Sequence, residues 1–140
     1  MPFKSLDAGL HVAPQITEQD IAAAADAGIK TIINVRPDGE QATAMTSADA
    51  RALAEARGLA YHHLPVTPTG IADEHVQGFR DLLDSAEGPV LAHCGSGLRA
   101  AVLWALSHAK EQGVEAVMAK AAGAGIDLSK VAPRLEQAAS

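Results

Sequence analysis

One short segment of this sequence holds the residue types that nucleophilic attack on an anionic group requires: HCGSGLR, residues 93–99. Cys94 is the only cysteine among 140 residues, so it can form no internal disulfide and no zinc site built from paired cysteines. A thiol attacks as its thiolate, and its pKa falls from about 8.5 to roughly 3.5–7.5 at a helix N-terminus or beside a cation. The segment offers both settings, and it therefore predicts a catalytic cysteine.

The residues after Cys94 are suited to bind an anion. Gly95 and Gly97 allow the backbone angles at which successive N–H groups converge, and Ser96 and Leu98 complete the same predicted loop. Arg99 then offers a planar fork for two oxygens of a phosphate, sulfate or thiosulfonate group. We expect Arg99 to be catalytic with Cys94 and the intervening residues to contact the anion.

Two other interpretations of this segment stay open. A lone cysteine at the end of a buried strand is commonly inert core, and a Gly-x-Gly loop alone is weak evidence. A second alternative is an inactive module that binds anions without turnover. The conjunction of strand, Cys94, two loop glycines, Arg99 and helix favours the catalytic hypothesis.

The elements around the loop alternate between strand-like and helix-like patterns. Strands are expected at residues 30–35, 60–66 and 90–93, with His11 and Val12 at the start or edge of the sheet. Helices are expected at 17–28, 47–58, 73–86 and 98–111, and again over 114–139 with a break at 123–125 and a disturbance at Pro133. The pattern predicts a single α/β domain, residues 1–140: a mostly parallel sheet with helices on both faces. Sites in such sheets form at the carboxyl ends of strands, where Cys94 lies.

Composition narrows the class of partner. The net charge of -6 and the 3% aromatic content argue against nucleic-acid binding. No signal peptide or run of about 18 apolar residues is present, so we expect a cytoplasmic protein without a membrane partner. The acidic residues are scattered, and His62 and His63 face opposite ways on a strand, so we expect no metal and no cofactor.

The chain resembles a known family over roughly residues 8–110. The segments that carry the likeness are 12–15 (VAPQ), 33–40 (INVRPDGE), 64–66 (LPV) and 88–106, of which the cysteine loop and NVRPDGE are the specific parts. On these it is similar to the beta-lactamase hydrolase-like phosphatase domains, which are also described as a sulfurtransferase-type family. The resemblance implies a fold like that of dual-specificity and tyrosine phosphatases. Relatives fused to a metallo-hydrolase domain carry a His-x-His-x-Asp-His signature that this sequence lacks.

The same resemblance makes sulfur transfer the leading prediction and phosphate hydrolysis the alternative. Only four residues separate Cys94 from Arg99, as in rhodaneses, whereas tyrosine phosphatases have five. Dual-specificity enzymes place a general acid after a strand like Leu64-Pro65-Val66, but the nearest acid here is Asp73, which is better suited to cap a helix. Such phosphatases also carry Ser or Thr where this chain has Ala100.

We therefore predict that Cys94 takes a sulfur atom from a small anionic donor, thiosulfate or a persulfide, and passes it to a thiol acceptor. Around the loop, Arg36 is expected either to bind the anion or to pair with Asp38 or Glu40. The resemblance implies that His93 tunes the thiolate through loop hydrogen bonds. The C-terminal helices could cover the site or form a homodimer.

Overall fold

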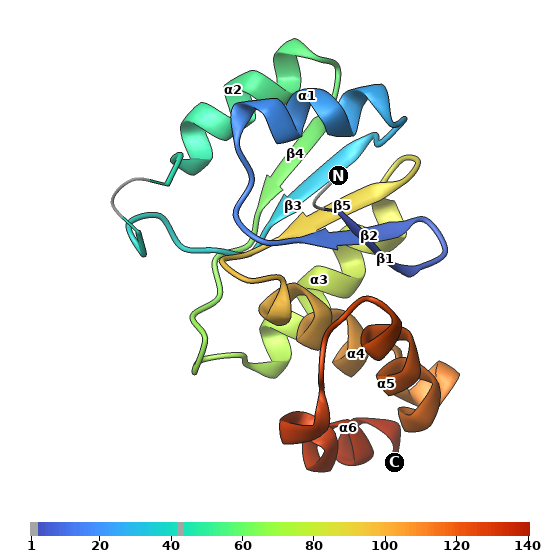
Figure 1. The fold of residues 1–140 in the computed structure, drawn as a ribbon. Coiled ribbons are helices and arrows are strands. Elements are labelled where there is room, and N and C mark those ends of the chain that lie inside the picture. Colours follow the sequence, from blue (N-terminus) through green and yellow to red (C-terminus); the bar gives the residue numbers. More distant parts are fainter. Residues whose placement is uncertain (1–2, 42–43) are drawn as a thin grey trace.

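The fold of the chain is a five-stranded sheet between two layers of helices, seen in a computed structural model that describes residues 3–41 and 44–140 (Figure 1). The strands are β1 (Lys4–Asp7), β2 (Leu10–Ala13), β3 (Thr31–Asn34), β4 (Ala60–His63) and β5 (Val90–His93). The α-helices are α1 (Glu18–Asp26), α2 (Ser47–Ala56), α3 (Asp73–Ser85), α4 (Leu98–Gln112), α5 (Val114–Gly123) and α6 (Ala132–Ala139), with a 3-10 turn at Ser129–Val131.

The sheet has the order β1-β2-β5-β3-β4, and every pair except β1–β2 is parallel. This confirms the predicted α/β class with a mostly parallel sheet. The strand carrying Cys94 at its end, β5, is central, and β3 lies directly beside it with Asn34 opposite His93. The chain segments that follow β3 and β5 therefore emerge at the same sheet edge, which positions the candidate site.

Two separate cores hold the helices on the sheet because neighbouring strand residues face opposite ways. Ile32 and Leu91 pack with α1 and α2, whereas Ile33 and Ala92 pack with the helices of the other face. Figure 1 shows α1 and α2 on one side of the strands and α3 to α6 on the other. Helix α4 is the most enclosed of the described helices, and its Trp104 is a core residue with only 1% of its surface exposed.

Local signals explain where several elements begin. The Thr17 hydroxyl accepts from the Asp20 N–H, and the Asp20 carboxylate accepts from the Thr17 N–H, so an acidic capping box begins α1. Pro133 lies in the first turn of α6 and begins that helix, contrary to the expected disturbance, because a first-turn residue needs no free N–H.

Two predictions about the strands were incomplete. The edge strand β1 was not anticipated, and β2, expected at the start or edge of the sheet, lies between β1 and β5. Strand β4 ends at His63 instead of residue 66, although the N–H groups of Leu64 and Val66 still bond to Asn34 and Val35 carbonyls. Pro65 between them has no N–H to continue the ladder.

Candidate active site

The residues from Cys94 to Arg99, here called the Cys94 loop, join β5 to α4. Cys94 directly follows the strand and has no exposed surface, and the N–H of Gly97 donates to its Sγ at 3.0 Å. Gly97 has φ of 91°, in the left-handed region that glycine tolerates best, and it directly precedes α4. The loop therefore turns a backbone N–H onto the sulfur, as its glycines predicted.

Gly95 provides the space in which two arginines approach the loop. A Cβ at this position would lie 3.3 Å from Nη2 of Arg99 and 3.8 Å from Nε of Arg36. Arg36 follows β3, so the parallel pairing of β3 with β5 brings it to the loop, as expected from the sequence. The candidate site thus brings two guanidinium groups to Gly95, the residue directly after the buried thiol.

Arg99 lies in the first turn of α4, and its guanidinium is held by the Glu40 carboxylate and by the Val66 carbonyl. Its Nη1 donates to Oε2 of Glu40 and to the Val66 carbonyl, both at 2.8 Å, while its Nη2 donates to Oε1 of Glu40 at 2.8 Å. The hydrogen bond to Glu40 is the main cause that raises the pKa of Arg99, with the charge and hydrogen bonding of Cys94 adding to it. Arg99 is therefore a fixed cation beside the sulfur.

The role of Glu40 at Arg99 was missed in the sequence, where Glu40 was considered only as a partner for Arg36. The segment NVRPDGE had been noted as specific, but nothing in it indicated a contact 59 residues along the chain. The hydrogen bond from Arg99 is the main cause that lowers the pKa of Glu40 below its ordinary value, so Glu40 is ionised at neutral pH.

Arg36 is engaged at every nitrogen of its guanidinium. Nε donates to Oε1 of Glu40 at 3.0 Å, Nη1 to Gln15 at 2.7 Å and Nη2 to Gln41 at 3.3 Å. Its backbone N–H donates to the Asn34 side-chain oxygen at 2.8 Å, so Asn34 fixes the backbone after β3. Of the two expectations for Arg36, the ion pair with Glu40 is present, and contact with an anionic substrate stays a prediction.

His93 is enclosed behind the loop, with 1% of its surface exposed. Burial lowers its pKa to about 4, against a smaller opposing contribution from the Cys94 backbone, so the ring is neutral at pH 7. Its nitrogens form no hydrogen bond of normal geometry with the described residues. The expectation that His93 tunes the thiolate therefore stays a prediction, and the cations close to the loop are Arg36 and Arg99.

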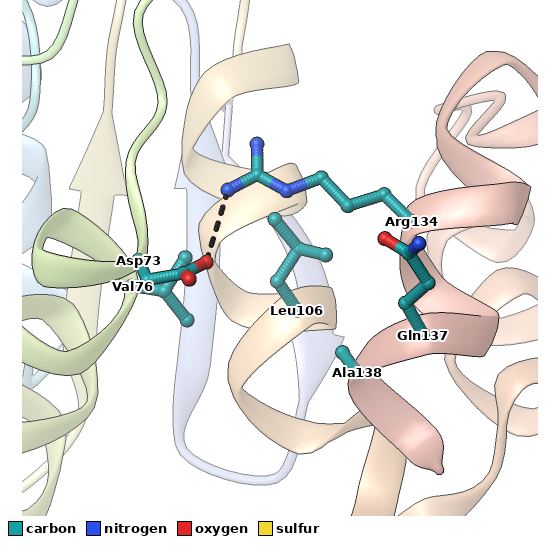
Figure 2. Close-up of a pocket in the computed structure, with 6 residues that line it drawn as sticks. All are labelled: Asp73, Val76, Leu106, Arg134, Gln137 and Ala138. Carbon is teal, nitrogen blue, oxygen red and sulfur yellow. Dashed lines mark hydrogen bonds and ion pairs between the residues drawn. The ribbon is translucent and has the colours of Figure 1, made fainter.

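Asp73, the nearest acid after Val66 in the sequence, is occupied elsewhere. It is the first residue of α3 and its carboxylate pairs with Arg134 of α6 at 3.5 Å, at a pocket of about 220 Å³ between α3, α4 and α6 (Figure 2). The expected capping role was wrong, because the residue before α3 is Ala72 and its N–H is capped by the His75 ring at 3.0 Å. Asp73 is therefore a surface ion-pair partner in this conformation.

The remaining loop residues form the rim of the site. Ser96 is exposed and its Oγ accepts from the Leu98 N–H at 3.4 Å, at the start of α4. Leu98 is 46% exposed, so its side chain is available for apolar contact with a bound molecule. Ala100 is fully buried beneath them and supplies no hydroxyl.

In residues 3–41 and 44–140, no three His, Cys, Asp or Glu side chains are grouped to hold a metal ion. None of the helices described is long and apolar enough to cross a bilayer.

The sheet, its helices and the Cys94 loop together define a domain with the fold of dual-specificity and tyrosine phosphatases. Within this fold class, the chain belongs to the family described as beta-lactamase hydrolase-like protein, phosphatase-like domain, which matches residues 2–111. This confirms the family resemblance noted in the sequence.

Individual relatives agree with this assignment. A beta-lactamase hydrolase-like protein of Xylella fastidiosa (strain 9a5c) is 33% identical over 141 residues, covering 99% of this chain but only 33% of the relative. The chain thus spans about a third of that curated relative. A crystal structure from Neisseria meningitidis z2491, described as a candidate phosphatase, is 37% identical with a TM-score of 0.91, covering 99% of each chain.

A more distant structure, the kinase associated phosphatase, shares the fold with a TM-score of 0.68 at 18% identity over 97% of this chain and 91% of its own. These matches support the phosphatase alternative better than the sulfurtransferase prediction, and none of these three relatives is described as a sulfurtransferase.

Proposed function

We propose that this domain is a cysteine-dependent phosphatase that hydrolyses phosphate monoesters through a phosphocysteine at Cys94. The observation that carries the proposal is the convergence of the Gly97 N–H and the Arg99 guanidinium at one buried sulfur. A thiolate stabilised in this way is a nucleophile, and the same donors stabilise charge on the transferring group. Membership of a phosphatase-like family supports the same reaction.

The proposed reaction has two steps. In the first, the Cys94 thiolate attacks phosphorus, a P–S bond forms and the bond to the leaving oxygen breaks. In the second, water attacks the phosphocysteine, releasing inorganic phosphate and restoring the thiolate, with the proton of water passing to solvent. Arg99 binds the oxygens of the phosphoryl group throughout, and loop N–H groups supply further donors.

The leaving group limits the substrate class. Glu40 is ionised through its bond to Arg99, and Asp73 is paired with Arg134 of α6, so neither of these carboxylates is placed as a general acid for the leaving oxygen. Without a general acid, the leaving oxygen must depart as an anion, which favours acidic alcohols such as phenols. The exposed Leu98 at the rim suits an aromatic leaving group. We therefore propose aryl phosphates as the best substrates.

Sulfur transfer is the second candidate, and a specific observation favours it. The spacing of four residues between Cys94 and Arg99 is that of rhodaneses, and persulfide formation needs no proton donor. In that reaction Cys94 would attack the outer sulfur of thiosulfate, sulfite would leave, and an acceptor thiol or cyanide would take the sulfur.

One experiment separates the two chemistries. The protein is incubated with an aryl phosphate or with thiosulfate, acid-quenched, and examined by intact mass spectrometry alongside Cys94→Ser. The proposal expects a phosphoryl adduct and released phenol from the first mixture, both absent in Cys94→Ser. A sulfur adduct from thiosulfate with no aryl phosphate turnover would replace it with the second candidate. Neither adduct, in a folded protein, would indicate the inactive anion-binding module.

A further inference from the structure

The N–H groups of Arg99 fall into two sets, those bonded to Glu40 and Val66 and those that these partners leave free. A guanidinium has five N–H groups, and three of those of Arg99 bond to Glu40 and the Val66 carbonyl. Among the described residues, the Nε–H and one Nη2 N–H are left without such a bond. These two form the side edge of the fork, whereas Glu40 occupies the end formed by Nη1 and Nη2.

The Nη2 atom of this free edge lies close to the loop. Nη2 would be the nearest atom to a Cβ on Gly95, at 3.3 Å, and Cys94 interacts with the Arg99 side chain through charge and hydrogen bonding. Glu40 thus binds the arginine on one edge and leaves the other for the loop. A parallel pair of N–H groups is the arrangement that binds two oxygens of a tetrahedral anion.

Glu40 is itself anchored. Its Oε1 accepts from Arg36 as well as from Arg99, and its side chain is 23% exposed. Arg36 in turn donates to Gln15, whose backbone N–H bonds to the Gly95 carbonyl at 3.3 Å. The carboxylate is therefore fixed against the segments that follow β2 and β3, and it is not a freely rotating surface group.

We propose that Glu40 is a positioning residue: it fixes Arg99 so that its Nε and Nη2 edge binds a tetrahedral dianion over Cys94. This deepens the proposed function and rests on it for the identity of the anion as a phosphoryl group. Arg36 holds Glu40 in place. The competing interpretation gives Glu40 the opposite effect, that of an internal carboxylate occupying the site of the anion.

Tungstate, a tetrahedral dianion, tests the proposal without any turnover. Its dissociation constant is measured by calorimetry for the wild type, Glu40→Gln, Arg99→Lys and the double variant. Glu40→Gln should weaken binding about tenfold, because the amide accepts fewer hydrogen bonds and carries no charge. Arg99→Lys should weaken it more, about fiftyfold, and Glu40→Gln should add little on top, since Glu40 acts through Arg99.

The chain offers a matched control. Arg80 forms a comparable pair with Glu111 on the surface between α3 and α4, so Glu111→Gln removes the same charge away from the site. Tungstate affinity should be unchanged in this variant. Thermal melting of each variant shows whether it is folded, and Glu40→Asp, with a shorter reach to Arg99, replaces Glu40→Gln if the latter does not fold.

Three outcomes would overturn the proposal. Tighter tungstate binding by Glu40→Gln would show that the carboxylate competes with the anion. Independent, additive effects of the two substitutions would show that Glu40 does not act through Arg99, and a wild type that does not bind tungstate would show that no anion edge is presented. A protein that binds tungstate as expected but hydrolyses no aryl phosphate would retain the positioning role and reject the phosphatase proposal.

Discussion

Arg99 in the Cys94 loop and Arg80 on α3 have the same kinds of partner. Each donates through Nη1 to a backbone carbonyl at 2.8 Å, Val66 for Arg99 and Ser107 for Arg80, and each pairs with carboxylate. The two arginines differ in which guanidinium nitrogens have a hydrogen-bond partner. Arg80 also donates through Nε to Asp84, so all three of its nitrogens are occupied, while Nε of Arg99 has no such bond among the described residues.

The ion pairs of the two arginines also differ in their exposure to solvent. The carboxylates around Arg80 are 57% and 64% exposed, so water competes for that network. The Arg99 side chain is 11% exposed and its partner Glu40 only 23%, and they lie beside a buried thiol. Arg80 thus joins two helices, whereas Arg99 is anchored by Glu40 and Val66 and keeps a pair of donors that neither of these partners occupies. A positive group that is fixed but not fully used is what an anion site requires.

Replacing each arginine with lysine should give the largest contrast. Lysine keeps the charge but loses the planar fork, so Arg99→Lys should lower kcat/KM for an aryl phosphate about a hundredfold. Arg80→Lys should stay within about twofold of the wild type, because it touches only α3 and α4 partners. Steady-state kinetics on both purified variants measures this, and equal losses would break the distinction between the two arginines.

Two glycines, one in each region, should respond to alanine with opposite signs. Gly97 has φ of 91°, so Gly97→Ala should cost about 1–2 kcal/mol in the free energy of unfolding. Gly78 lies inside α3, and an added Cβ would meet Leu64 Cδ1 at 3.4 Å, an ordinary contact. Gly78→Ala should therefore gain up to about 1 kcal/mol from helix propensity. Urea unfolding of both variants measures these changes. A destabilised Gly78→Ala would show that the added Cβ cannot be accommodated beside Leu64.

The parts of this molecule that follow local rules could be predicted from the sequence. The capping box of α1 needs only Thr17 and Asp20, three residues apart, and strand β5 followed by glycines and Arg99 identified the Cys94 loop. Strand β1 could not be predicted in this way, because its four residues, KSLD, carry little apolar pattern and depend on pairing with β2.

The contact between Glu40 and Arg99 also lay beyond local rules. It joins residues 59 positions apart and exists only because β3 and β5 are adjacent and parallel, which places the loop after β3 over the loop after β5. Asp73 was assigned to a cap from its residue type, but its partner Arg134 comes from α6, a helix whose position the sequence did not specify. Residue preferences therefore could not predict these ion pairs, because the partner of each carboxylate depends on the tertiary structure.

Neutralising Glu40 and neutralising Glu111 should change the free energy of unfolding by amounts that differ little at pH 7 but differ clearly in their pH dependence. Neutralising Glu40 leaves the guanidiniums of Arg36 and Arg99 facing each other, so Glu40→Gln should lower the free energy of unfolding by about 1 kcal/mol at pH 7, and Glu111→Gln by about half of that or less. The pKa of Glu40 is lowered in the folded state from 4.5, chiefly by its hydrogen bond from Arg99, so its contribution is complete above that value. It is lost as the pH falls through the lower, folded value, where the wild type and Glu40→Gln should converge. Urea unfolding from pH 7 to pH 3 measures the difference, and a gap that widens on acidification would show that Glu40 is not held as an anion by Arg99.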